Sequence, residues 1–88
     1  MEIRFEKKFL KQLSKIKNIE TADSVRKAIS NVESASSISQ ISHLKKLKGF
    51  SNYYRIKIGD FRIGILLEEN IIDFVCLMHR KEIYVYFP

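Results

Sequence analysis

The stretch Tyr53-Tyr-Arg-Ile-Lys-Ile-Gly-Asp-Phe-Arg62 carries the clearest structural signal in this 88-residue sequence. Polar and apolar residues alternate on both sides of Gly59-Asp60, which is typical of two β-strands with one buried face. Glycine at the first central position of a two-residue loop favours a type II′ turn. The segment therefore predicts a tight hairpin, and its turn length determines which residues lie opposite each other.

The predicted register is Ile58 with Phe61, Lys57 with Arg62, Ile56 with Ile63, and Arg55 with Gly64. Alternation places one set on the core face: Tyr54, Ile56, Ile58, Phe61, Ile63 and Ile65. The opposite face then carries Tyr53, Arg55, Lys57 and Arg62, while Gly64 leaves a gap where we expect a substrate to approach. Like charges directly across an antiparallel pair destabilise a sheet. Cations on this face without a carboxylate therefore predict a bound polyanion.

The distribution of charge supports this interpretation. The net charge is +6, and residues 45–62 hold six basic residues against one acidic residue, a local balance of +5. The cations upstream of the hairpin are Lys45, Lys46 and Lys48. Such clustering favours a polyanion partner such as nucleic acid. The alternative is a solvated face that is basic without function.

Length and composition describe one globular domain over residues 1–88, with 45% apolar and 30% charged residues. Cys76 is the only cysteine, so an internal disulfide is excluded. Charged residues near the N-terminus, and the lack of any apolar run of ~20 residues, predict a cytoplasmic protein without membrane attachment. Neither metal-ligand spacing nor a nucleotide-binding glycine loop is present, so we expect no metal and no cofactor.

Upstream of the hairpin, the sequence predicts a short strand over 3–5 and a helix over 6–17, the latter from Phe5, Phe9, Leu13 and Ile16. Thr21 is the expected N-cap of a second helix, whose buried stripe is Val25, Ala28, Ile29 and Val32. The serine-rich segment 34–42 reads as a surface connection held to the core by Ile38 and Ile41. Residues 43–49 predict one more helical turn, ended by Gly49.

Downstream, strands are expected over 61–67, 71–78 and 83–87, with Asn70 at positive φ in the turn between the first two. Continued alternation puts Phe74, Cys76 and Met78 in the core. It puts Asp73, Val75, Leu77 and His79 on the cationic face. The predicted fold is α+β: a short N-terminal strand, then two antiparallel helices packed on one face of an antiparallel β-meander.

The cationic face suits RNA cleavage by the RNA's own 2′-hydroxyl, which needs a base, an acid and cations for the phosphorane charge. Arg55 and Arg62 suit charge stabilisation, because arginine does not give up its proton. Lys57 lies between them and is a candidate base, with His79 as a second candidate. Arg80 reaches the same phosphate only if the strand ends or bulges near His79.

The order of elements and two motifs, Tyr54-Arg-Ile-Lys-Ile-Gly-Asp-Phe-Arg62 and His79-Arg-Lys-Glu-Ile-Tyr84, resemble the RelE/ParE toxin superfamily, and its RelE branch most. This resemblance implies the toxin of a type II toxin–antitoxin system. Such toxins cut messenger RNA in the ribosomal A site, by attack of the 2′-hydroxyl on the adjacent phosphate and without a metal. A small antitoxin neutralises them, and operator DNA is bound only through that antitoxin.

The resemblance also implies roles for individual residues. Lys57 helps to activate the 2′-hydroxyl, Arg62 holds the phosphate, Arg80 is an acid or charge stabiliser, and Tyr84 stacks on a base. A lysine often stands at the position of Arg55, so arginine there argues for a purely electrostatic role. The further RNA-binding candidates are Lys45, Lys46, Lys48, Tyr53, His79, Lys81 and Tyr86.

Three alternatives stay open at this stage. Tyr84 and Tyr86 are rival stacking residues, and either is equally readable as a packing residue of a final strand. A ParE-like inhibitor of DNA gyrase would share the fold but has no need of four cations on one sheet face. A non-catalytic RNA-binding module would bind in a salt-sensitive way without cleavage.

Overall fold

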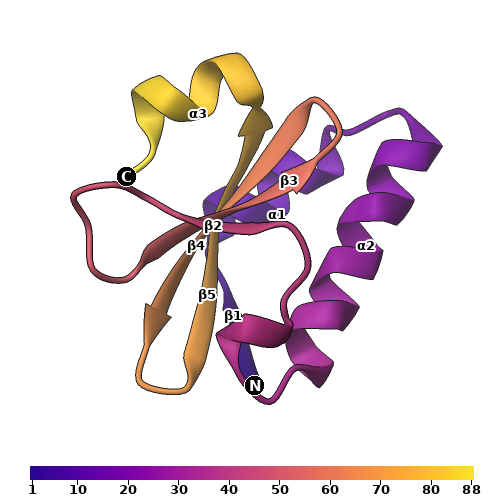
Figure 1. Ribbon diagram of the computed structural model, residues 1–88. Helices are drawn as coiled ribbons and strands as arrows, with labels where there is room; N and C mark the ends of the chain where they lie inside the picture. The colour runs from indigo at the N-terminus through magenta and orange to yellow at the C-terminus, as the bar shows by residue number, and fades with distance from the viewer.

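A computed structural model describes residues 1–88 as a five-stranded sheet with helices on both faces (Figure 1). The elements are β1 (Glu2–Phe5), α1 (Lys7–Ser14), α2 (Ile19–Ser34), the short 3₁₀ helix η1 (Ile38–Gln40), β2 (Leu44–Lys46), β3 (Tyr53–Ile58), β4 (Phe61–Glu68), β5 (Ile71–His79) and α3 (Arg80–Tyr86). No helix combines the length and the apolar character needed to cross a membrane.

The strand order in the sheet is β1-β5-β4-β3-β2. β1 runs parallel to β5, and every other neighbouring pair is antiparallel. The predicted hairpin register is confirmed at all four pairs, from Ile58 opposite Phe61 to Arg55 opposite Gly64. Gly59 has a φ of 55° and Asp60 a negative φ, the combination that a type II′ turn requires.

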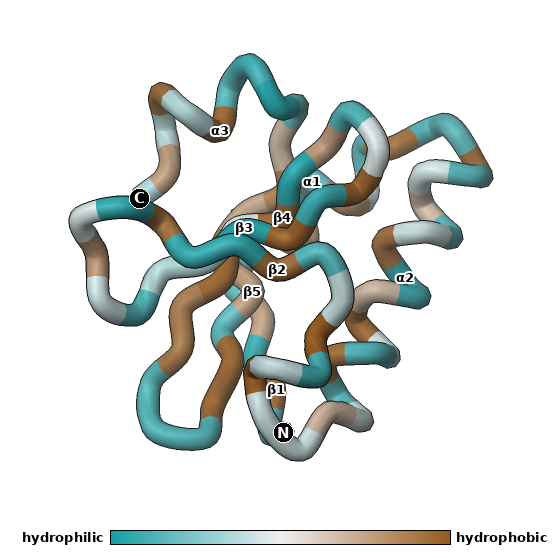
Figure 2. Tube along the Cα trace, viewed as in Figure 1, coloured by the Kyte–Doolittle hydropathy of each residue, from teal (hydrophilic) through white to brown (hydrophobic).

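The main core lies between the sheet and the helices α1 and α2. Its fully buried side chains come from every layer: Phe9, Val25, Val32, Ile56, Ile63, Ile65, Ile72 and Phe74. Phe5, Phe9 and Phe74 form an aromatic cluster with ring centroids 5.1–5.7 Å apart. Figure 2 shows the hydrophobic residues concentrated along the strands at the middle of the molecule. The predicted core face of the hairpin and the predicted stripe of α2 are confirmed.

The first helix is shorter than predicted, and the second begins earlier. Asn18, not Thr21, is the N-cap of α2, because its Oδ1 accepts a hydrogen bond of 2.9 Å from the backbone N–H of Thr21. An asparagine with non-helical backbone at this position stops the chain from continuing as one helix. Residues 15–18 consequently form the connection that the sequence pattern assigned partly to α1.

The predicted helical turn over 43–49 is wrong, because the chain forms the edge strand β2 there. Leu44 lies opposite Ile56, and Lys45 lies opposite Arg55. The spacing of Leu44 and Leu47 resembles one helical turn, but pairing with β3 satisfies the backbone groups that a single isolated turn leaves open. Gly49, with a φ of 85°, lies in the loop from β2 to β3 instead of ending a helix.

A β-bulge in β5 changes the predicted facing of that strand. Gly64 lies opposite Cys76 and Ile65 opposite Phe74, so Val75 is the extra residue. One inserted residue reverses the alternation beyond it. Leu77 therefore belongs to the main core, whereas Cys76 and Met78 face the opposite side of the sheet. The predicted placement of Cys76, Met78, Leu77 and His79 is wrong for this reason. In the β4–β5 turn, Glu69 and not Asn70 has the positive φ, 55°.

The predicted final strand over 83–87 is instead helix α3, which lies on the side of the sheet opposite to α2 (Figure 1). Ile83 and Phe87 are four residues apart, so a helix points both toward the sheet. There they bury a second, smaller core with Leu47, Cys76 and Met78. The same burial raises the pKa of the Cys76 thiol. The apolar surface exposed by the bulge thus decides that this segment is a helix.

Gly64 makes the docking of α3 possible. A Cβ atom at this position would lie 2.7 Å from Cys76 Sγ and 2.8 Å from the ring of Phe87. These separations are well below van der Waals contact. The gap that the sequence predicted opposite Arg55 is therefore filled by Phe87 and is not a substrate entrance.

Asp73 is an unusual polar group at the other end of the sheet. Its Oδ1 is buried and has no hydrogen-bond partner. Burial raises the pKa of Asp73 from 3.8 to about 6, the neighbouring Glu6 carboxyl adds to the rise, and Arg4 opposes it. The ionised carboxylate therefore destabilises the folded chain.

We expect Gly64→Ala to destabilise the protein by about 1–3 kcal/mol, because Phe87 must move to admit the methyl group. Urea denaturation followed by circular dichroism measures this. In the double variant Gly64→Ala/Phe87→Leu, the loss in free energy of unfolding should be smaller than the sum of the losses in the two single variants. Full additivity would contradict the contact between Gly64 and Phe87.

We expect Asp73→Asn to stabilise the protein at pH 7 and to have little effect at pH 4. The raised pKa means that the wild-type stability is intact below pH 4 and falls as the pH rises through about 6. The gain at pH 7 should be on the order of 1–2 kcal/mol, below the ~3 kcal/mol of a two-unit shift because the carboxyl is partly exposed. Urea titrations at both pH values, with Glu33→Gln as the charge-matched control, measure it. A gain at both pH values would contradict this account.

Candidate functional site: a cationic hollow on the sheet

Two pairs of like charges lie side by side on the sheet face that carries α3. Lys57 is directly opposite Arg62 across β3 and β4, and Lys45 is directly opposite Arg55 across β2 and β3. The first pair was predicted from the hairpin. The second follows from β2, which the sequence did not predict. Each pair costs sheet stability, and a bound anion would offset that cost.

These residues line a hollow of about 350 Å³, which we call the cationic hollow. Its lining is His43, Leu44, Lys45, Arg55, Lys57, Arg62 and Tyr84. β3 and β4 provide its floor, β2 provides one side, and α3 provides Tyr84. Its size is sufficient for one phosphate with part of a nucleotide.

No carboxylate neutralises the cations of the hollow. The only ion pair in the chain joins Arg26 and Asp23, which lie on α2. Lys45 and Lys57 are exposed, whereas Arg55 and Arg62 are half-buried. The positive charge is therefore available to a ligand, and the partial burial of the two arginines strengthens its field.

Arg62 is held in place by the hairpin turn. Its Nη1 donates hydrogen bonds of 2.8 Å to the backbone carbonyls of Gly59 and Phe61. The remaining N–H groups of the guanidinium make no hydrogen bond within the chain, so they can donate to a ligand. The turn thus orients the cation before any ligand arrives.

Tyr84, and not Tyr86, lies beside the cations. The Cζ atom of Arg55 lies 4.6 Å from the centroid of the Tyr84 ring, which is a cation–π contact. The Tyr84 side chain is nevertheless 67% exposed, so most of its ring is open to a stacking partner. Tyr86 instead lines a separate depression beside α1, together with Lys8 and His79. Of the two tyrosines that the sequence offered as stacking residues, only Tyr84 lines the cationic hollow.

Three predicted site residues near the end of β5 do not line the cationic hollow. His79 lies on the α1 side of the sheet and contacts the ring of Phe61, with centroids 5.8 Å apart. Its Nδ1 accepts a hydrogen bond of 3.2 Å from the backbone N–H of Lys81 and caps α3. Arg80 and Lys81 are exposed in the first turn of α3. The expectation that His79 reaches the phosphate is wrong, because the bulge in β5 turns it to the other face.

The other predicted RNA-binding residues occupy neighbouring positions. Lys46 and Lys48 line a shallow depression along the β2–β3 loop, which shares Lys45 with the cationic hollow. Tyr53 is a packing residue, because its ring makes edge-to-face contacts with Phe50 and Phe87 at centroid distances of 5.7 and 5.4 Å. The two lysines extend the positive surface beyond the hollow, whereas Tyr53 supports the second core.

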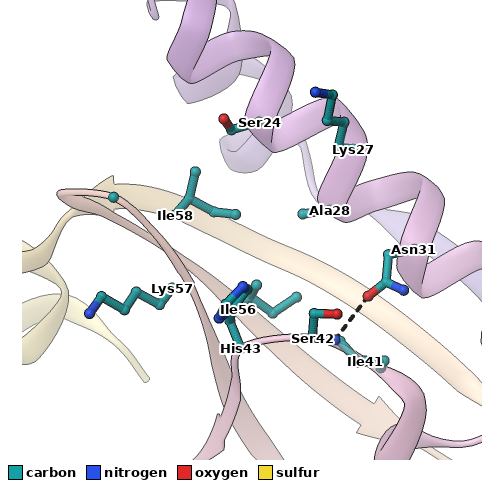
Figure 3. Close-up of a pocket in the computed structure, with 11 residues that line it drawn as sticks. Ser24, Lys27, Ala28, Asn31, Ile41, Ser42, His43, Ile56, Lys57 and Ile58 are labelled. Carbon is teal, nitrogen blue, oxygen red and sulfur yellow. Dashed lines mark hydrogen bonds between the residues drawn. The ribbon is translucent and has the colours of Figure 1, made fainter.

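His43 is the functional candidate that the sequence reasoning missed. It lines both the cationic hollow and a groove of about 430 Å³ between α2 and the sheet, in which Lys57 is also a lining residue (Figure 3). Side chains of α2, including Ala28 and Asn31, face Ile56 and Ile58 across this groove, while Lys57 extends away from α2. The sequence predicted a helical turn over 43–49, and in a helix His43 would not lie beside Lys57. Only the pairing of β2 with β3 brings the two residues together.

The comparisons with known proteins agree with this fold. A family model described as "ParE toxin of type II toxin-antitoxin system, parDE" matches residues 3–84. The toxin RelE3 of Methanocaldococcus jannaschii is 53% identical over 45 residues, which span about half of this chain and about half of that curated relative (51% each).

Solved structures give the same result over nearly the whole chain. The crystal structure of a RelB–RelE antitoxin–toxin complex from Methanococcus jannaschii matches with a TM-score of 0.79 and 35% identity, over 97% of this chain and 99% of that one. The intact RelBE toxin–antitoxin complex of E. coli matches in fold, with a TM-score of 0.70 and 17% identity over 89% of this chain and 94% of that one.

The fold and the family match place the chain in the RelE/ParE class of small α+β toxins. The chain belongs to the RelE/ParE superfamily of type II toxin–antitoxin toxins, and within it to the RelE-like members.

We expect Lys57→Gln to raise the free energy of unfolding by about 0.2–1 kcal/mol, because it removes the like-charge pair with Arg62. The same change should weaken binding of a short single-stranded RNA. It should also reduce the slope of log affinity against log salt by about 0.7, the loss of one phosphate contact. Urea denaturation and fluorescence anisotropy measure the two effects.

The charge-matched control is Lys17→Gln, since Lys17 is exposed in the α1–α2 connection far from the hollow in sequence and outside its lining. It should change neither the salt slope nor the RNA affinity beyond the small general effect of one charge. Equal effects of the two variants would contradict a localised phosphate site.

Proposed function

We propose that this protein is a metal-independent endoribonuclease that cleaves messenger RNA in the ribosomal A site. The observation that carries this proposal is the cationic hollow, in which Arg55, Lys57 and Arg62 converge without a carboxylate beside the exposed ring of Tyr84. In the reaction, the 2′-hydroxyl of one nucleotide attacks the phosphate that follows it. The products are a 2′,3′-cyclic phosphate and a 5′-hydroxyl.

The cations supply the charge stabilisation that this reaction needs. Negative charge grows on the non-bridging oxygens as the phosphorane forms, and oriented donors stabilise it most when they need no rearrangement. Arg62 meets this requirement, because the carbonyls of Gly59 and Phe61 hold its guanidinium. Lys57 lies directly opposite and gives a second contact from the neighbouring strand.

Arg80 is proposed as a further cation, although it does not line the hollow in the free protein. Its backbone N–H donates a hydrogen bond of 2.8 Å to the carbonyl of Asp60, in the same turn that holds Arg62. Arg80 and Arg62 are therefore anchored at the same hairpin turn. Rotation of the exposed Arg80 side chain toward a bound phosphate is the rearrangement that this role requires.

Tyr84 is proposed to stack on a base next to the cleaved phosphate. Exposed aromatic rings beside basic side chains are the usual platforms for unpaired bases. Arg55 contacts the Tyr84 ring at 4.6 Å and limits its orientation. Base stacking and phosphate contact would then fix both ends of a nucleotide.

The ribosome is the proposed second component of the site. The hollow is lined by seven residues and is large enough for about one nucleotide, so a longer RNA strand needs another component to hold its 2′-hydroxyl in line for attack. Correct alignment of reacting groups contributes several kcal/mol to such reactions, and a ribosome-bound message is already immobilised. Little cleavage of free RNA is expected.

An antitoxin is the proposed protein partner. The matching structures from Methanococcus jannaschii, Pyrococcus horikoshii and E. coli are complexes of RelE with RelB. A toxin with an open cationic site needs such a partner to remain harmless in the cell that makes it. We propose that operator DNA is bound only through this antitoxin and that the toxin acts in the cytoplasm.

Inhibition of DNA gyrase is the second candidate, because the family model that matches residues 3–84 carries the ParE description. The cationic hollow favours the nuclease, since holding a phosphate explains both like-charge pairs. A non-catalytic RNA-binding module would explain the charge but not the ordered arrangement of Arg62 and Tyr84.

Brief expression in a bacterial host followed by mapping of messenger 5′ ends tests the proposal. We expect new ends within codons of translated messages, and a loss of at least about 10²-fold in Lys57→Ala, Arg62→Ala or Arg80→Ala, as for removal of one charge-stabilising donor. Lys17→Ala is the control and should cleave like the wild type.

Intact messages together with damaged DNA would refute the nuclease and support the gyrase alternative. Intact messages with salt-sensitive RNA binding would support the non-catalytic module instead.

A further inference from the structure

The proposed reaction needs a group that takes the proton of the attacking 2′-hydroxyl, and the cationic hollow offers few. Arg55 and Arg62 do not give up their protons and cannot serve. His79, the second candidate base from the sequence, faces the other side of the sheet. We infer that His43 is the general base of this site, an assignment that rests on the proposed function.

The sheet register places His43 at the end of a row of functional side chains. The backbone N–H of Lys57 donates a hydrogen bond of 3.2 Å to the carbonyl of His43, which continues the β2–β3 pairing by one residue. Lys57 is in turn opposite Arg62. The row His43–Lys57–Arg62 therefore runs from the residue before β2, across β3, to β4, and all three residues line the cationic hollow.

The imidazole of His43 has no structural task. It is exposed and makes no hydrogen bond within the chain. His79 differs, because its Nδ1 is occupied by the backbone N–H of Lys81 and its ring packs on Phe61. Of the two histidines, only His43 has both ring nitrogens available to a substrate.

The backbone at His43 is held in an uncommon conformation. His43 has a φ of 61°, in the left-handed region, and such a conformation persists in a residue other than glycine when the surrounding structure imposes it. The neighbouring Ser42 supplies that constraint, since its N–H donates a hydrogen bond of 2.9 Å to Asn31 Oδ1 on α2 (Figure 3). The segment is thus fixed to α2 on one side and to β3 on the other, so the backbone that carries the imidazole is already held in the free protein.

The charged residues that line the two depressions around His43 are all basic. They are Lys27 from α2, Lys45 from β2, Arg55 and Lys57 from β3, and Arg62 from β4. Tyr84 from α3 is the other titratable group of the hollow. No carboxylate is available there to act as base or to pair with an imidazolium. Histidine is the side chain whose ordinary pKa lies closest to neutrality, and a base of that strength suits the task.

The proton and electron balance of the step is complete without a co-reactant. A ring nitrogen of His43 takes the proton of the 2′-hydroxyl as the O2′–P bond forms. The P–O5′ bond breaks, its electron pair remains on O5′, and that oxygen takes a proton from solvent. Lys57 and Arg62 neutralise the phosphorane, so Lys57 stabilises charge and does not abstract the proton.

Single-turnover cleavage of a defined message in programmed ribosomes tests this assignment with the full-length protein. His43→Gly suits the left-handed backbone and should lower the rate by about 10²–10⁴-fold, the usual contribution of a general base. Added imidazole should restore part of the rate in His43→Gly alone. The wild-type rate should fall at acid pH, because a protonated base cannot accept the 2′-hydroxyl proton, and this fall should be absent in His43→Gly.

Matched variants separate this role from others. His79→Asn keeps a helix-capping side chain and should retain the wild-type pH dependence. Lys57→Ala should have a low cleavage rate. That rate should still fall at acid pH, and added imidazole should not restore it. Loss of the fall in rate at acid pH in His79→Asn or in Lys57→Ala would overturn the assignment. An unchanged rate in His43→Gly would also overturn it.

A His43→Gly variant that cleaves slowly, shows no rescue by imidazole and keeps the fall in rate at acid pH would indicate a structural role for His43. That result would also overturn the assignment. A wild-type protein that leaves the message intact would refute the proposed function itself. An active wild type with an unaffected His43→Gly would refute only the inference about His43.

Discussion

The two-residue turn at Gly59-Asp60 is the constraint on which the site depends. Because strand side chains alternate with a period of two, the turn places Ile56 and Ile63 together in the core and Lys57 and Arg62 together on the opposite face. Burial of the isoleucines stabilises this register, and a slip by one residue would expose them and bury the cations. The hydrophobic core thereby holds two like charges against each other, which neither side chain would favour alone.

The second face of the sheet is shaped by a bulge and a glycine. The extra residue Val75 turns Cys76 and Met78 away from the main core, and Gly64 leaves the space that the Phe87 ring fills. Together they create a small apolar surface that holds α3 against the sheet. The functional result is indirect but specific, because α3 carries Tyr84 to the edge of the cationic hollow and turns Tyr86 away.

The electrostatic design favours function over stability. Two like-charge cross-strand pairs and an uncompensated local charge lower the stability of the free protein, and a bound phosphate would remove that cost. The left-handed backbone at His43 is a further local cost next to the same cations. Their concentration around one hollow separates the candidate site from a generally basic surface.

The sequence by itself determined the hairpin register, its core and cationic faces, and the stripe of α2, because a two-residue turn and a clear period leave one arrangement. Tertiary structure alone decided the strand at Leu44–Lys46, the helix at Arg80–Tyr86, and the side on which His79 lies. Short apolar segments fit a strand or a helix equally well until the surface that they cover is known. A one-residue bulge likewise leaves no local signal, yet it reverses every side chain beyond it. His43 could not be assigned to the site from the sequence, because the other residues of the hollow are distant from it in the chain. The pairing of β2 with β3 brings them together.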